Sequence, residues 1–420
     1  MVPNGSTTMN HGTGATRASV ARPVLLLGLR SVDEHGRRGR PGIAWRSGRL
    51  HSPSGLRTAN LRMELADHLA FAGLINAHDH LHLNLFPPLP SSGDPLLSLP
   101  VRDAADWVDA MRERIERPDH RVLRALPTGL RAWHGGLKNI LAGATTVLHH
   151  DPPLGLFRRR DFPVHVPRRI GWAHSVGLST SYGPDLTAAW ERRDHARPWF
   201  IHVAEGRDGR AATEFRRLLT VTGLNRALRL VHGVGLAEAD RRLAIATGMG
   251  LVACPISNHR LLGRTGPIRD FAAAGQAALG SDSRLTGGRD LLAELHFAWT
   301  AGLASSTELL NMVGVGAARL CGEPSRGRLA AGLPADLVVI ADDGRPPAAQ
   351  LCTLQRSSLR LVLRGGRPRV ADPDFGPLFA ATQTPWHAVV LDGRPKLVAS
   401  DLLTPLIAAG IGEPGLYLPT

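Results

Sequence analysis

Lysine is nearly absent from this 420-residue chain. Only Lys138 and Lys396 occur, although lysine and arginine together number 50, so nearly all the basic charge is arginine. The arginines are scattered beside Ala, Gly and Pro, whereas a nucleic-acid-binding surface would gather them in a stripe. The net charge of +14 therefore does not predict a nucleic-acid partner. We expect a solvated basic surface.

Cysteine and long apolar runs are also scarce. Three cysteines, Cys254, Cys321 and Cys352, without a C-x-x-C motif exclude a disulfide framework and a cysteine zinc site, and they favour a reducing compartment. Runs such as Val24–Leu27 are too short to cross a bilayer. Residues 1–22 are rich in Gly, Ser, Thr and Asn and lack an apolar core, which predicts a disordered leader and no signal peptide. We expect a cytoplasmic protein with no membrane partner.

Short apolar segments alternate with helical stretches through the middle of the chain. Such alternation predicts βα units and a parallel sheet. The units recur at roughly 29 residues, as a (β/α)8 TIM-like barrel requires. A helical stretch is expected at 164–169, and the fourth strand has to fit between residues 177 and 198. The other seven strands are expected near 71–77, 143–148, 170–176, 199–203, 228–232, 250–254 and 277–280.

Both ends of the chain carry short apolar runs separated by Gly, Pro and Asp-Gly turns. We therefore predict an α/β protein with two parts. The barrel spans 71–327, and a small β-sandwich domain is formed by both chain ends, residues 23–70 with 328–420.

Four side chains of the types that bind metal ions stand at the ends of predicted strands. His78 and His80 follow the first strand and, being two residues apart, point to the same side of an extended chain. His202 ends a strand near residue 200, and Asp282 follows the last one. In a barrel these strand ends meet at the active site. Three imidazoles and a carboxylate suit zinc or ferrous iron, with one position open for water.

Further polar side chains follow the same strands. His150 and His174 face the mouth in a barrel, and His82 extends the first motif into a loop. We predict that these three histidines contact substrate, with core packing as the alternative for His150 and His174. Arg284 and Arg289 are interpreted as solvated arginines, with binding of a substrate anion as the alternative.

Several segments together resemble signatures of the amidohydrolase superfamily. Two of them, Ile201–Glu205 and Cys254–Asn258, are similar to elements of its branch of cytosine, guanine and triazine deaminases and chlorohydrolases. The chain departs from the family pattern at Ala72 and Asp79, where Pro and Thr are usual. The other similar segments are Gly73–His80, Val231–Gly233, Gly280–Ser283 and Gly332–Val339.

The resemblance implies a site with one divalent metal ion, Zn²⁺ in the first place and Fe²⁺ as the alternative. No lysine lies between Lys138 and Lys396, so a carbamylated lysine on the fourth strand cannot bridge two metals. The resemblance further implies that Asp282 ligates the metal and accepts a proton from water. Glu205 would carry a proton to the leaving group, and His232 would hydrogen-bond the attacked carbonyl or the water.

These observations predict a mononuclear metal-dependent hydrolase, an aminohydrolase or deaminase. It would act on a C–N bond of a small heterocyclic molecule through a metal-bound hydroxide. A cyclic-amide hydrolase or a chlorohydrolase of the same superfamily is the first alternative, and a non-catalytic binding protein on the same fold is the second. A homo-oligomer is compatible with the sequence.

Overall fold

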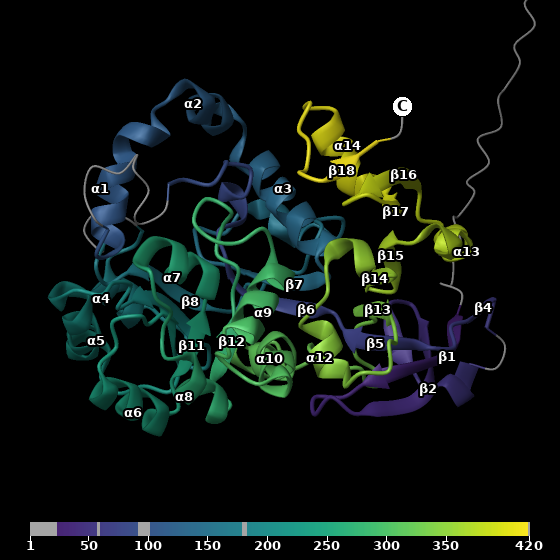
Figure 1. Ribbon diagram of the computed structural model, residues 1–420, viewed down its shortest axis with the longest axis horizontal. Helices are drawn as coiled ribbons and strands as arrows, with labels where there is room; N and C mark the ends of the chain where they lie inside the picture. The colour runs from purple at the N-terminus through teal and green to yellow at the C-terminus, as the bar shows by residue number, and fades with distance from the viewer. Residues whose placement is uncertain (1–22, 57–58, 91–100, 179–182, 419–420) are drawn as a thin grey trace, which may run out of the picture.

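The computed structural model describes residues 23–56, 59–90, 101–178 and 183–418. The predicted leader, residues 1–22, lies outside these residues. The described chain folds into parallel strands surrounded by helices and a separate large sheet that contains both ends of the chain (Figure 1). The predicted α/β class is confirmed.

The parallel strands form two groups. Strands β8 to β12 make a five-stranded sheet in the order β12-β11-β10-β9-β8, and β6 pairs with β7. The backbone N–H of Asp282 donates to the carbonyl of His78 at 3.1 Å, which joins the end of β12 to β6. The strands are β6 (Leu74–Asp79), β7 (Ala144–His149), β8 (Gly171–Ser175), β9 (Trp199–Val203), β10 (Leu228–His232), β11 (Gly250–Ala253) and β12 (Ala277–Leu279).

The predicted position of the fourth strand is wrong. Strand β8 pairs directly with β9, with Gly171 opposite Trp199, so no strand fits between them. Instead His165 forms a parallel bridge to Thr146 of β7, in a segment predicted as helical. Pro163 and Pro167 flank the valines on either side of His165. The residue before a proline is driven to extended conformations, and β-branched residues favour strands, so this segment is extended.

Helices flank the parallel strands (Figure 1). Pro127 separates α2 from α3. The helices of this part are α1 (Ala104–Ile115), α2 (Pro118–Ala125), α3 (Thr128–Leu141), α4 (Leu186–Glu191), α5 (Gly209–Thr222), α6 (Glu238–Thr247), α7 (Pro255–Leu262), α8 (Ile268–Ala273), α9 (Leu291–Thr300), α10 (Ser306–Val313) and α11 (Val315–Leu320). In the described part of the chain, none of the helices has the length and apolar character that crossing a bilayer requires.

Eleven strands from the two ends of the chain share one mixed sheet. Its centre is β13, which pairs antiparallel with β5 on one side and with β14 on the other, so that Leu337 lies opposite Ala72. The strands are β1 (Val24–Val32), β2 (Arg38–Arg46), β3 (Arg49–His51), β4 (Leu61–Glu64), β5 (His68–Ala72), β13 (Leu337–Ala341), β14 (Leu361–Arg364), β15 (Arg367–Ala371), β16 (Trp386–Leu391), β17 (Arg394–Ala399) and β18 (Leu416–Tyr417). The helices of this part are α12 (Pro347–Leu351), α13 (Gly376–Ala381) and α14 (Ser400–Ile407).

Candidate metal centre and active site

Three strand ends, those of β6, β9 and β12, bring the four predicted metal ligands together. Nε2 of His202, on β9, lies 3.2 Å from Nε2 of His78, on β6. Oδ1 of Asp282, just after β12, lies 3.9 Å from Nε2 of His78 and 3.7 Å from Nε2 of His80. All four residues are buried. Residues up to 204 positions apart in the chain therefore offer their donor atoms to one small volume.

The spacing and chemistry of these donors fit a metal ion. Ligands held about 2.0–2.1 Å from a tetrahedral zinc lie roughly 3.3 Å apart, close to the separations between these side chains. His78 belongs to two groups whose donor atoms all lie within 4.8 Å of one another, one with His202 and His232 and one with His80 and Asp282. Burial, followed by the neighbouring histidines, holds the pKa of both His78 and His202 well below the ordinary value. Neutral imidazole is the form that binds metal.

Asp151 orients His80, and the sequence analysis assigned it no role. Its Oδ2 lies 2.6 Å from Nδ1 of His80, which turns Nε2 toward Asp282. Burial lowers the pKa of His80, but the carboxylates of Asp151, Asp282 and Asp79, with Asp151 foremost, together outweigh burial and raise it to about 9. Metal-binding histidines commonly donate their second N–H to a carboxylate in this way. The signal in the sequence was the carboxylate directly after the pair His149-His150 at the end of a predicted strand.

Two hydroxyl groups fix the carboxylate of Asp282. Ser257 and Thr286 each donate to its Oδ2 at 2.8 Å, which leaves Oδ1 on the side of the histidines. Burial raises the pKa of Asp282, but His80 and His232, followed by these hydroxyl bonds, bring it below its ordinary value. The group is therefore an ionised carboxylate at neutral pH, the form in which it could hold a metal ion.

His232 and Glu205 face each other at the edge of the cluster. Nδ1 of His232 lies 2.8 Å from Oδ1 of Asn258, whose amide oxygen can only accept, so Nδ1 donates and Nε2 is the ring nitrogen directed away from Asn258. That Nε2 lies 3.5 Å from Oε1 of Glu205. Burial raises the pKa of Glu205. Asn258 and Ser257 both come from the C-P-I-S-N segment at the start of α7, so this motif supports the two residues that end β10 and β12.

Three of the seven described non-glycine residues with a positive φ angle lie at the same place. Ala204, His232 and Asp282 have φ angles of 54°, 70° and 52°, a left-handed region that costs a residue with a Cβ atom free energy. Ala204 immediately follows β9, His232 ends β10, and Asp282 lies three residues after the last residue of β12. Such outliers cluster at functional sites, where the surrounding structure holds them.

The three histidines predicted as substrate contacts lie at different depths. The ring of His150 is fully buried 4.4 Å from that of His202, and its Nε2 donates to the carbonyl of Ala173. The ring of His174 lies 4.9 Å from His202 and 6.0 Å from His80. His82 lies outside these, with Nδ1 3.6 Å from Asp151. His150 and His174 thus adjoin the metal ligands, whereas His82 lies beyond Asp151.

An ion pair inside the protein connects the strand ends that carry the ligands. Nζ of Lys138, on α3, lies 3.1 Å from Oδ2 of Asp79, which stands between His78 and His80. The ammonium group also donates to Asn84 at 2.8 Å and to Ser281 at 2.9 Å. The aspartate in place of the family's usual threonine therefore has a dedicated cationic partner.

Arg284 is not solvated, so the prediction of a surface arginine is wrong here. It is buried and forms two hydrogen bonds with the carboxylate of Glu413, from the segment after α14. The same carboxylate accepts from Arg356 at 2.6 Å and lies 3.0 Å from Nε2 of His134. Opposite charges from distant segments are satisfied together, which allows them to be buried.

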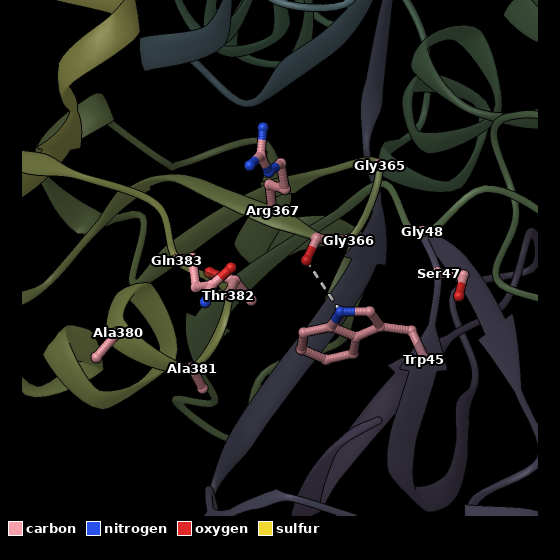
Figure 2. Close-up of a pocket in the computed structure, with 10 residues that line it drawn as sticks. All are labelled: Trp45, Ser47, Gly48, Gly365, Gly366, Arg367, Ala380, Ala381, Thr382 and Gln383. Atoms are coloured by element: carbon pink, nitrogen blue, oxygen red, sulfur yellow. Dashed lines mark hydrogen bonds between the residues drawn. The ribbon is translucent and has the colours of Figure 1, made fainter. Parts of the chain in front are cut away.

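A cavity that shares no lining residue with the histidine cluster lies in the mixed sheet. It has a volume of about 420 Å³ and is bounded by the turns at Gly48 and Gly366 and by the residues around Thr382 (Figure 2). The indole N–H of Trp45 donates to the carbonyl of Gly366 at 3.0 Å (Figure 2). None of the ten described residues that line it is a His, Cys, Asp or Glu. We place the functional site at the histidine cluster, because ligand and proton-transfer groups converge there.

Known proteins resemble the chain in sequence and in fold. No family model matches it. An isoxanthopterin deaminase from an unknown prokaryotic organism is 30% identical over 310 residues, which cover 65% of this chain and 55% of that protein. A 5-methylthioadenosine/S-adenosylhomocysteine deaminase of Pelotomaculum thermopropionicum is 31% identical over 163 residues, 35% of this chain and 37% of that protein. The chain thus spans about half the length, or less, of these curated relatives.

Solved structures match over most of the chain. The atrazine chlorohydrolase of Arthrobacter aurescens TC1 complexed with zinc has a TM-score of 0.64 and 18% identity, covering 86% of this chain and 99% of that one. An adenosine deaminase from Xanthomonas campestris with bound zinc has a TM-score of 0.62 and 18% identity, covering 86% and 97%. Together with the curated deaminase names, these likenesses indicate the amidohydrolase superfamily. The superfamily that these comparisons indicate is the one predicted from the motifs of the sequence.

Proposed function

We propose that this protein is a mononuclear metal-dependent aminohydrolase that removes an amino group from a small heterocycle. The observation that carries the proposal is the convergence of His78, His80, His202 and Asp282 on one buried point. Glu205, a carboxyl with a raised pKa, stands beside that point. The deaminase names of the curated relatives favour ammonia as the leaving group.

The scaffold that we propose for this site is a closed (β/α)8 barrel of residues 71–327. The bridge between Thr146 and His165 supplies an eighth strand position, next to β7. The hydrogen bond from Asp282 to His78 connects the last strand to the first. Residues 23–70 with 328–420 would form the β-sandwich-like accessory domain, supported by the shared sheet of both chain ends.

His78, His80, His202 and Asp282 would hold one divalent ion, with Zn²⁺ in the first place and Fe²⁺ as the alternative. Three imidazoles with one carboxylate are donors that both ions accept. When bound, such an ion lowers the pKa of a water molecule to about 7 and supplies a nucleophile at neutral pH. His232 stays outside this set, since its Nε2 is needed opposite Glu205.

The side chains around the ion divide the proton transfers. Asp282 would accept a proton from the attacking water through Oδ1, because Oδ2 accepts from two hydroxyl groups whereas Oδ1 accepts one backbone N–H, that of Ser283. Glu205 then delivers a proton to the leaving nitrogen. Burial raises its pKa, which is the direction that a general acid requires. His232, held by Asn258, orients the attacked group.

His82, His150 and His174 are the proposed substrate contacts. His174 lies in the same ring cluster as His80 and His202, which suits a flat heterocycle stacked or hydrogen-bonded beside the metal. Fully buried His150 would act from the floor of the site and His82 from its rim. A small-molecule substrate, a cytoplasmic location and the absence of a nucleic-acid partner stay predictions of the sequence.

The test measures both the metal content and the turnover of the wild type and of two variants. Elemental analysis of the wild type should find about one zinc or iron per chain, and His202→Ala should lose it. Wild-type protein should then release ammonia from an aminopurine, aminopyrimidine, aminopterin or aminotriazine, while Glu205→Gln keeps its metal and loses turnover. A wild type that takes up no metal on reconstitution contradicts the proposal. Chloride or ring-opened product in place of ammonia would assign the alternative reactions.

A further inference from the structure

Ala204 makes a strained turn between two residues of the proposed site. It separates His202 from Glu205, is completely buried and has a φ of 54°. Alanine carries a Cβ atom, so this left-handed backbone does not persist without restraint from its surroundings. Because the turn determines where Glu205 emerges from β9, whatever restrains Ala204 also sets the position of Glu205.

Three hydrogen bonds restrain the turn, and one comes from a side chain. The N–H of Ala204 donates to Oε2 of Glu214 at 2.7 Å. Its carbonyl accepts from the N–H of Gly235 at 2.7 Å, and the carbonyl of Glu205 accepts from Ala104 at 3.0 Å. The last two contacts join backbone to backbone, so a substitution cannot remove them selectively. The contact with Glu214 can be removed.

Glu214 is held where it can perform this role. It lies on α5, whose neighbouring side chains Phe215 and Leu218 are fully buried in the core. Asp208 caps the start of the helix by accepting from the N–H of Ala211 at 3.0 Å. Such a cap and a buried apolar face fix a helix in place. The carboxylate therefore meets Ala204 from a rigid support.

Glu214 and Glu205 also face the same small cavity, of about 130 Å³. Gly177 leaves room for the carboxylate there, since a Cβ atom at this position would lie 2.5 Å from Oε1 of Glu214. Glu214 thus stands directly behind Glu205, away from the metal ligands. It does not touch the reacting atoms.

We propose that Glu214 is a positioning residue for Glu205, acting through the backbone of Ala204. The inference rests on the proposed function, in which Glu205 transfers the proton. Loss of the contact lets the turn relax and moves Glu205 away from His232 and the leaving group. Substrate binding and the metal ligands are unaffected. The value of kcat therefore falls, while KM and the metal content do not change.

The experiment compares Glu214→Ala with Glu214→Gln, since the amide oxygen of glutamine can still accept from Ala204. The exposed Glu238→Ala, on α6, is the matched control. In Glu214→Ala we expect faster hydrogen exchange in a peptide spanning 203–207. We also expect kcat lower by about 10- to 100-fold, as for loss of a hydrogen bond to a charged group, with KM and metal content unchanged. Glu214→Gln should retain kcat within about threefold and wild-type exchange, because it keeps the acceptor.

Several results overturn the proposal. Unchanged exchange at 203–207 in Glu214→Ala means that the contact does not hold the turn. Equal losses of kcat in the alanine and glutamine variants mean that the charge matters and the acceptor does not. Loss of metal in Glu214→Ala means that the residue supports the whole site. If wild-type protein turns over no amine, the proposed function fails instead, and the exchange measurement still decides whether Glu214 holds the turn.

Discussion

Lys138 and Asp79 form an ion pair from which water is excluded, with neither side chain exposed and 3.1 Å between Nζ and Oδ2. The pair joins α3 to the end of β6 and, through Ser281, to the end of β12. The pair adjoins the predicted metal ligands, because Asp79 lies between His78 and His80 and Ser281 precedes Asp282. A buried charge that loses its partner is strongly destabilising.

We therefore expect Lys138→Met to lower the free energy of unfolding by about 3–5 kcal/mol, because Asp79 is left charged and buried. The double variant Asp79→Asn/Lys138→Met should recover part of this loss. Urea unfolding of the metal-loaded proteins measures both. A single variant as stable as the wild type would show that Asp79 is satisfied by its neutral neighbours alone.

The orientation of His80 by Asp151 gives a prediction about metal affinity. Asp151→Asn keeps the shape of the side chain and loses the charge that fixes the His80 ring. Removal of such a partner typically weakens metal binding about 10- to 100-fold. Competition with a chelator measures the affinity. Asp161→Asn, in an exposed pair with Arg159, is the control that should leave it unchanged.

Glu294 gives a prediction about pH. Burial raises the pKa of this fully buried carboxyl from its ordinary 4.5 to about 8, although it accepts from the N–H groups of Ile256 and Gly288. A raised pKa in the folded state contributes stability below pH 4.5 that is lost as the pH rises through about 8. Between these values the loss is at most about 1.4 kcal/mol per pH unit. In Glu294→Gln the part of the pH dependence that comes from this carboxyl should disappear, whether the variant is more or less stable than the wild type.

The test is the urea concentration at the unfolding midpoint, measured for wild type and Glu294→Gln from pH 5 to 8.5. Metal binding affects both proteins alike, so the difference between their two curves reports on Glu294. Glu238→Gln, on the surface of α6, should follow the wild type. Parallel curves for wild type and Glu294→Gln would contradict the prediction.

Glu413 should be essential for stability although it lies far from the metal ligands in sequence. Its replacement by alanine leaves Arg284 and Arg356 buried without their carboxylate, at a cost of about 3–5 kcal/mol. Glu116→Ala, which removes an exposed ion pair with Arg124, should cost less than about 1 kcal/mol. Chemical denaturation compares the two, and equal effects would contradict the buried role of Glu413.

The strand ends could be predicted from sequence because each combines an apolar run with a polar residue at a fixed place. That pattern located His78, His202, His232 and Asp282, and the structure brings them together. The fourth strand could not be located, because Val164–Val166 is too short to show a period and its prolines interrupt the pattern. Its position became clear only from the bridge between Thr146 and His165.

The supporting residues were predicted less well, for a physical reason. Hydroxyl and carboxylate groups occur throughout the chain, and their roles depend on partners far away in sequence. Thr286 can donate to Asp282 only because the chain between them folds back. The pairing of Lys138 with Asp79, 59 residues apart, has no local signature. By contrast, the family resemblance was carried by contiguous motifs and needed no such information.

The central strand of the mixed sheet has a consequence for synthesis on the ribosome. β13 pairs with β5 through Leu337 and Ala72, so the first strands of the protein are translated long before their partner. Until residues 337–341 emerge, β5 has an unpaired edge, which is prone to pair with other chains. A nascent or truncated polypeptide that stops before β13 would carry this open edge, and we expect it to depend on chaperones or to aggregate.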